Sequence, residues 1–229
     1  MRIRFANPAW AVPAAALMLG ACTSTIALPP VSVAATDKEP IAGRYRVVVQ
    51  TGGWHIKPDR KGWTCSAYGY EMDVDAVYVP AMREALAQVV AKPDFADTIV
   101  PPGDLRAEGY DGQIVIQQTN AAVVFAVESR LFFGADTNVD VGLTTISAVI
   151  GEAGLQDQRT SEGRAKNKSG TFLCSESEEI IQEATNRAIG DLVVKTAAAV
   201  RESLTMARKT ADGAAPQPSV ATSSSTGRM

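Results

Sequence analysis

The stretch Ala122–Phe133, which reads AVVFAVESRLFF, decides the fold class. Every second side chain along most of it is apolar, whereas Glu128 and Arg130 fall on the opposite side. Successive side chains of a strand point to opposite faces of a sheet, so this pattern predicts a strand with one buried face. The residues on that face are Val123, Phe125, Val127, Leu131 and Phe133. Such a strand needs a second layer to cover it.

Further strands are predicted on both sides of this stretch. Residues 44–50 (RYRVVVQ) alternate apolar and polar side chains, and residues 112–118 (GQIVIQQ) are rich in β-branched residues. Residues 139–150 continue with threonine and β-branched residues. The polar segment 155–166 is either a last solvated strand or a loop.

Two predicted helices supply the covering layer. Residues 75–91 carry an apolar stripe at helical spacing, and Pro80 requires the helix to begin near Ala76 so that the proline falls in the first turn. A long second helix opens at Ser175, with Glu178 at the spacing of a capping box. The order is β-α-β-β-β-α. It predicts an α+β two-layer sandwich, in which one mostly antiparallel sheet of about four strands is covered by two helices.

Composition excludes several classes of protein. The 229 residues are 46% hydrophobic and 21% charged, with a net charge of −3. These values are typical of globular domains and unlike those of collagen-like, disordered or multi-span membrane chains. The chain is mildly acidic and has no basic run, which argues against a nucleic-acid partner.

The N-terminus has the pattern of an export signal. Arg2 and Arg4 precede an apolar, uncharged stretch, residues 5–21, which Pro8 and Pro13 interrupt. That stretch is short for a spanning helix, which needs ~20 apolar residues, so a signal peptide over residues 1–21 is predicted.

The signal ends in Leu19-Gly20-Ala21-Cys22, which resembles the lipobox of bacterial lipoproteins. In that family the peptidase cuts before the cysteine, which carries diacylglycerol on its thiol and an acyl chain such as palmitate on its amine. The resemblance therefore implies lipidation of Cys22. Because Thr23 follows the cysteine in place of the aspartate that retains such proteins at the inner membrane, it also implies a periplasm-facing anchor in the outer membrane.

Domain boundaries follow from composition. Residues 22–42 are predicted to be a lipidated cysteine and a flexible tether, residues 43–208 the periplasmic domain, and residues 209–229 a disordered tail. An ordinary signal peptide, cut after Ala27 or Ala34, is the alternative to the lipobox.

Two cysteines remain after lipidation. Cys65 and Cys174 each precede a predicted helix, and an oxidising periplasm favours a disulfide between them. Two buried thiols are the alternative.

Catalytic and metal-binding patterns are weak. His55 is the single histidine, no G-x-S-x-G motif occurs, and one histidine with two separated cysteines does not make a zinc site. Carboxylates at Glu71, Asp73 and Asp75 fit either acid–base chemistry or the N-terminus of a helix. We expect no enzyme activity, no cofactor and no metal.

A cluster of large side chains in a loop is the candidate partner-binding surface. Tryptophan, tyrosine and arginine dominate binding hot spots. The cluster comprises Trp54, Arg60, Trp63, Tyr68 and Tyr70. The alternative is that these residues cap the open end of the sheet.

The lipobox, the tether and the order of elements together resemble small α/β envelope lipoproteins. These include the lipopolysaccharide-assembly lipoprotein of the outer membrane, auxiliary lipoproteins of lipid-transport systems, and activators of penicillin-binding proteins. The resemblance implies a non-enzymatic accessory or docking subunit of an envelope assembly or transport system, with an envelope protein as partner. A module that binds a lipid, glycan or other small ligand between sheet and helices is the alternative.

Overall fold

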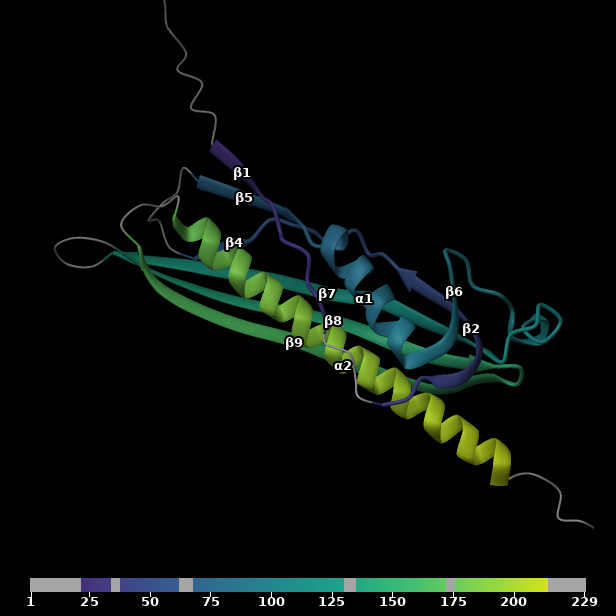
Figure 1. The fold of residues 1–229 in the computed structure, drawn as a ribbon. Helices are drawn as coiled ribbons and strands as arrows, with labels where there is room; N and C mark the ends of the chain where they lie inside the picture. Colours follow the sequence, from purple (N-terminus) through teal and green to yellow (C-terminus); the bar gives the residue numbers. More distant parts are fainter. Residues whose placement is uncertain (1–21, 34–37, 62–67, 130–134, 172–175, 214–229) are drawn as a thin grey trace, which may run out of the picture.

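A long mixed sheet is the base of the molecule (Figure 1). The computed structural model describes residues 22–33, 38–61, 68–129, 135–171 and 176–213. Within these ranges the strands are β1 (Cys22–Ile26), β2 (Ile41–Gln50), β3 (His55–Ile56), β4 (Asp59–Lys61), β5 (Tyr68–Asp73), β6 (Val90–Ala96), β7 (Gly112–Ser129), β8 (Ala135–Gly151) and β9 (Gly154–Thr171). The helices are α1 (Asp75–Val89) and α2 (Ser177–Gly213), and Pro102–Asp104 forms a 3₁₀ turn.

The main sheet has the strand order β6-β2-β7-β8-β9. Strand β2 runs parallel to both of its neighbours, whereas β7, β8 and β9 form an antiparallel meander. Strand β7 is long enough to carry two partners on one side. Its first part, Gly112–Gln117, pairs with β2, and its later part, Val124–Ala126, pairs with β4.

The predicted single sheet of about four mostly antiparallel strands is wrong. The main sheet has six strands of mixed direction, and β1, β5 and β3 form a second sheet of three strands. The parallel pairing arises because β2, α1 and β6 form a crossover unit. Helix α1 ends at Val89, two residues before the predicted end at residue 91, and the chain continues directly into β6, which contains Pro93. Proline is tolerated there because β6 is an edge strand.

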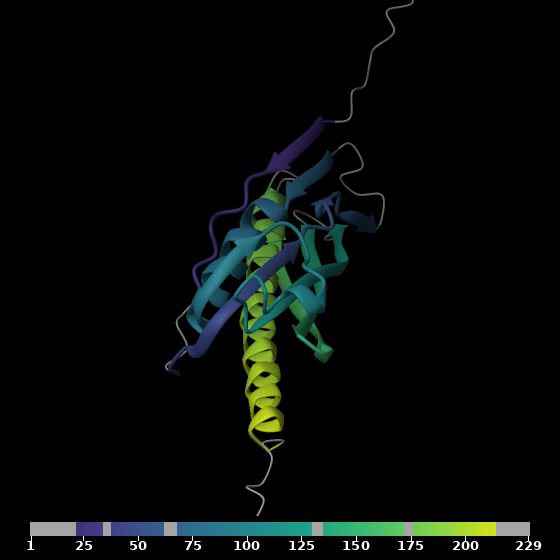
Figure 2. The ribbon, with the colours of Figure 1, turned by 90° about the vertical axis from the view of Figure 1, so that its right-hand side faces the viewer.

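One face of the main sheet is covered and forms the core. Helix α2 lies over β8 and β9, α1 lies beside α2, and the small sheet contacts β7 through Tyr70 and Phe125 (Figures 1 and 2). The predicted apolar face of the 122–133 stretch points into this core, since Val123, Phe125 and Val127 are all buried. Residues 130–133 of that stretch lie outside the described ranges.

Helix α2 approaches β9 closely at Gly163. A β-carbon built on Gly163 would lie 2.6 Å from Cβ of Leu192, and closer still to the carbonyl oxygen of Ala188. Buried hydroxyls of Thr145 and Thr196 hydrogen-bond across the same layer boundary at 3.1 Å. At this crossing the space between helix and sheet is filled by backbone and small side chains.

Both predicted domain boundaries shift. Part of the predicted tether is packed structure, because β1 pairs with β5 and because Ile26 and Val33 are buried in the core. Helix α2 continues to Gly213, beyond the predicted start of the tail at residue 209. Pro80 lies past the first turn of α1, which begins at Asp75. The signal-peptide segment and residues 214–229 lie outside the described ranges.

Candidate functional site

Two of the predicted partner-binding aromatics belong to the core. Trp54 is 7% exposed and packs against Tyr78 with ring centroids 5.3 Å apart. Tyr70 is 4% exposed and meets Phe125 edge-on at 5.5 Å. A partner cannot contact these rings, so the prediction of a docking surface is wrong for both. Trp54 packs on α1 through Tyr78, and Tyr70 packs between the small sheet and β7 through Phe125.

The remaining predicted site residues are only partly described. Arg60 lies in β4 opposite Phe125 and is half-buried. Tyr68 begins β5, and Cys22 begins β1, but their side chains are not described. Trp63 and the predicted Cys65–Cys174 disulfide lie outside the described ranges. The disulfide stays a prediction.

The acidic residues considered for acid–base chemistry have structural partners. Asp75 accepts hydrogen bonds from Nε2 of Gln118 at 2.6 Å and from the backbone N–H of Trp54 at 3.1 Å. His55 is an exposed residue with Nδ1 3.8 Å from Asp73. No group of three or more potential metal ligands occurs in the part of the chain that the structure describes.

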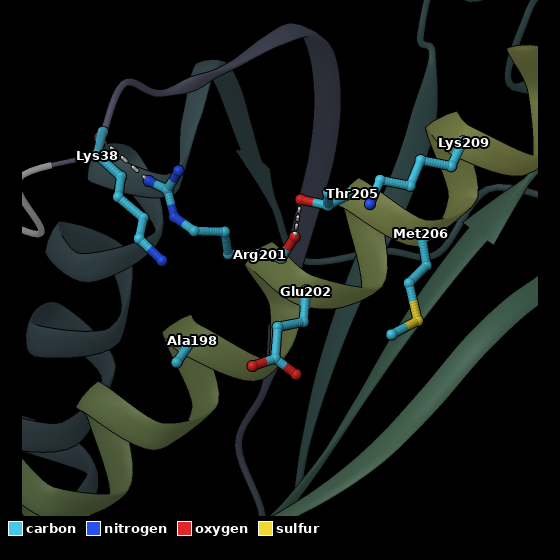
Figure 3. A pocket seen from close by; sticks show the side chains of 7 residues that line it. All are labelled: Lys38, Ala198, Arg201, Glu202, Thr205, Met206 and Lys209. Atoms are coloured by element: carbon cyan, nitrogen blue, oxygen red, sulfur yellow. Dashed lines mark hydrogen bonds between the residues drawn. The ribbon is translucent and has the colours of Figure 1, made fainter.

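A surface groove runs along the C-terminal half of α2 (Figure 3). Its volume is about 540 Å³. Residues four apart on a helix lie on one side, so the helical wall consists of two adjacent rows. One row holds Ala198, Glu202 and Met206, the other holds Arg201, Thr205 and Lys209, and Lys38 from the segment before β2 forms the opposite wall.

Arg201 positions the two walls. Its guanidinium donates to the backbone carbonyl of Glu39 at 2.8 Å and, at longer range, to those of Lys38 and Gln88. The Gln88 carbonyl lies in the last turn of α1, where backbone acceptors lack intrahelical partners. One half-buried arginine therefore joins α2, the end of α1 and the segment that leads into β2.

The groove is amphipathic and carries an excess of positive charge. Met206 is 55% exposed, and Ala198 is an exposed small apolar neighbour on the same row. The single carboxylate of the lining, Glu202, is held by Arg159 at 2.6 Å. The lining also presents three cations, on Lys38, Arg201 and Lys209.

A polar cluster fixes α2 to β9 beneath the groove. Asp157 accepts a hydrogen bond from the Ser203 hydroxyl at 2.6 Å and pairs with Arg159 at 2.9 Å. The Ser203 hydroxyl, and then Arg159, lower the pKa of the Asp157 carboxyl. The same carboxyl raises the pKa of Arg159. Asp157 is therefore ionised at neutral pH, and Arg159 links β9 to Glu202 of the groove.

Sequence reasoning missed this groove. Its walls come from Lys38, in the predicted tether, and from α2 residues as far as Lys209, in the predicted tail. The available signal was the helical spacing of Ala198, Glu202 and Met206, which continues the second helix toward its end.

Comparisons with known proteins assign no family. No protein-family model matches the chain, and no curated protein matches it. A solved structure from Xanthomonas campestris, of the DUF330 family, shares 9% identity at a TM-score of 0.43, covering 80% of this chain and 99% of that one. A neuraminyllactose-binding hemagglutinin homolog from Helicobacter pylori shares 9% identity at a TM-score of 0.46, covering 81% of this chain and 100% of that one. PelC from Paraburkholderia phytofirmans shares 15% identity at a TM-score of 0.20, covering 70% and 98%.

Similarity of this degree assigns no activity.

None of the helices in the described ranges is both long and apolar enough to cross a membrane.

Proposed function

We propose that this chain is a non-enzymatic, lipid-anchored lipoprotein of the outer membrane that faces the periplasm. It serves as an accessory or docking subunit of an envelope assembly or transport system. The lipobox supplies the anchor at Cys22. The observation that carries the proposal is that residues 22–26, which follow the predicted cut, pair with β5, and that Ile26 is buried in the core.

The packing of β1 supports a cut before Cys22 over a later cut. A cut after Ala27 would remove all of β1 together with Ile26, which is 2% exposed. Burying an isoleucine side chain stabilises a fold by about 1.5–3 kcal/mol, and the cut would also expose one edge of β5. A cut before Cys22 leaves the domain whole, which supports lipoprotein processing.

The α2 groove is the proposed docking surface. An exposed methionine adapts its shape to different apolar partners, and surrounding cations favour an acidic partner. The groove offers contacts but no nucleophile paired with a base among its seven lining residues. We therefore infer that it binds an acidic segment, with apolar side chains, of an envelope protein.

The alternative of a ligand between sheet and helices has less support. At Gly163 the layers are too close to admit even a β-carbon. The groove, by contrast, lies on the outer side of α2, where a protein segment can reach it.

Photo-crosslinking in cells tests the docking surface. A crosslinking amino acid at Met206 should yield one partner adduct, whereas one at Ile99, an apolar residue 47% exposed outside the groove, should not. Lys209→Glu should reduce the Met206 adduct at least several-fold, while Lys168→Glu, an exposed lysine on β9, should leave it unchanged. Equal adducts from Met206 and Ile99, or equal effects of the two charge reversals, would contradict the proposal.

A further inference from the structure

We propose that the end of the domain that carries Cys22 lies directly against the phospholipid headgroups, and that α2 holds its groove at the membrane-distal end. This inference rests on the proposed lipidation of Cys22 and adds the orientation of the molecule. The end of the domain that carries Cys22 then contacts the bilayer surface, and the groove binds its protein partner in the periplasm.

The first observation is that no flexible linker separates Cys22 from the strand β1. Strand β1 pairs in parallel with β5 from its first residue, with Cys22 opposite Tyr68 and Ile26 opposite Met72. A flexible tether of about twenty residues would allow ~25 Å of separation. Here the residue that follows the anchor is already hydrogen-bonded into a sheet, so the domain surface stays within a few ångströms of the acylated cysteine.

The second step places the start of α2 at the same end. The Ser24 hydroxyl of β1 donates to the Glu178 carboxylate in the first turn of α2 at 3.2 Å. Ser177 also hydrogen-bonds Thr137 near the beginning of β8, at 3.1 Å. Figures 1 and 2 show β1 and the first turns of α2 at one end of the molecule and the last turns of α2 at the other.

The third step is that α2 is a long, fixed spacer. Its 37 residues span about 55 Å, and Arg201 lies about 36 Å along the axis from Ser177. Side-chain hydrogen bonds join the helix to the sheet in its first turn, near its middle and in its C-terminal half. The pairs are Ser177–Thr137, Thr196–Thr145 and Ser203–Asp157. The distance between anchor and groove is therefore set by one continuous body.

The acidic residues at the start of α2 bear on which lipid surface suits the anchored end. Glu178 and Glu179 lie in the first turn of α2 and Glu176 directly precedes it, and anionic headgroups would repel these carboxylates. The acyl chains, worth ~0.8 kcal/mol per buried methylene, must therefore provide the attachment, and a zwitterionic surface permits the closest approach.

Depth-dependent quenching tests this orientation. The full lipidated protein is placed in phosphatidylcholine vesicles that contain a headgroup-linked nitroxide quencher. A fluorophore is attached through a bio-orthogonal amino acid at Glu179, exposed at the anchored end, or at Thr210, exposed at the far end. We expect quenching at Glu179 at least five-fold stronger than at Thr210.

A variant with a flexible linker after Cys22 tests whether the direct attachment of β1 sets the orientation. Inserting a Thr-Ser-Gly linker of about twenty residues after Cys22 should restore ~25 Å of slack and abolish the difference between the two positions. Incorporation of labelled palmitate is read in the same samples. Acylated protein with equal quenching at both positions, or stronger quenching at Thr210, overturns the orientation alone. Absence of acyl chains on Cys22 overturns the proposed function and the orientation with it.

Discussion

Replacing Gly163 with alanine should push α2 away from the main sheet. The new β-carbon would lie 2.6 Å from Cβ of Leu192 and closer still to a backbone carbonyl, so the helix must retreat by about 1 Å to restore an ordinary contact. Overpacking of this kind costs about 1–3 kcal/mol. We expect the upper end, about 3 kcal/mol, because the contacted atoms belong to the helix backbone and its first side-chain carbon and cannot rotate away.

The movement would also weaken polar contacts that depend on the close approach. The Asp191 carboxylate accepts the backbone N–H of Arg164 at 3.1 Å, and Lys195 donates to the carbonyl of Glu162 at 3.0 Å. These side chains cover hydrogen-bonding groups along the outer edge of β9, which would otherwise be available to a further strand. A displaced helix should therefore lower stability and also promote aggregation.

Thermal unfolding, followed by circular dichroism on the unanchored Cys22→Ala protein, measures the effect. A loss of about 3 kcal/mol corresponds to a fall in Tm of about 6–12 °C for a domain of this size. Gly142→Ala on the neighbouring strand is the matched control, because its β-carbon would come no closer than 4.0 Å to Glu162 Oε1. The control should melt within about 2 °C of the parent, since alanine in a strand relieves the entropic cost of glycine. Similar Tm values for the two variants would refute the close-packing argument.

Arg201→Ala should lower stability by about 1–3 kcal/mol and reduce crosslinking from Met206, because three backbone carbonyls lose their donor. Arg187→Ala, which removes an exposed pair with Glu183, should change Tm by less than about 1 °C in a thermal melt. The fold lowers the pKa of the Asp157 carboxyl, so its stabilisation is present above its ordinary pKa of about 4 and is lost as the pH falls through the lower folded value. Asp157→Asn should therefore lower Tm at pH 7, and the difference from the parent should shrink as the pH falls through the lowered pKa of Asp157; a constant difference across the range would contradict this. Non-reducing mass spectrometry should find a Cys65–Cys174 linked peptide in protein purified from the periplasm, and two thiols that alkylate freely in native protein would contradict the predicted bridge.

Local pattern predicted the elements better than their arrangement. Both helices and the alternation in Ala122–Phe133 follow from side-chain spacing alone. Strand β6 was not predicted, because Lys92-Pro93 is a helix stop and nothing local shows that the chain continues as a parallel edge strand beside β2. The sequence did not distinguish a strand from a loop for β9, because its residues are mostly polar and exposed. Its strand conformation depends on pairing with β8, which no local pattern indicates.

The site was harder to predict for the same reason. Trp54 and Tyr70 are residue types typical of a hot spot, but Trp54 is buried against Tyr78 of α1 and Tyr70 against Phe125 of β7. Residues 22–33 show no helical or strand periodicity, yet Ile26 fills the core once β1 pairs with β5. The groove joins Lys38 to the end of α2, and no pattern within either segment indicates the other.

The mature N-terminus is the most direct test of a lipid-anchored docking protein. Tandem mass spectrometry of detergent-extracted protein should identify an N-terminal peptide that begins at Cys22, with a diacylglyceryl group on sulfur and an acyl chain on the α-amine. Cys22→Ala should abolish that peptide and release the protein into the soluble periplasmic fraction. An unmodified N-terminus at Leu28 or Ala35, in protein that still folds, would contradict the account.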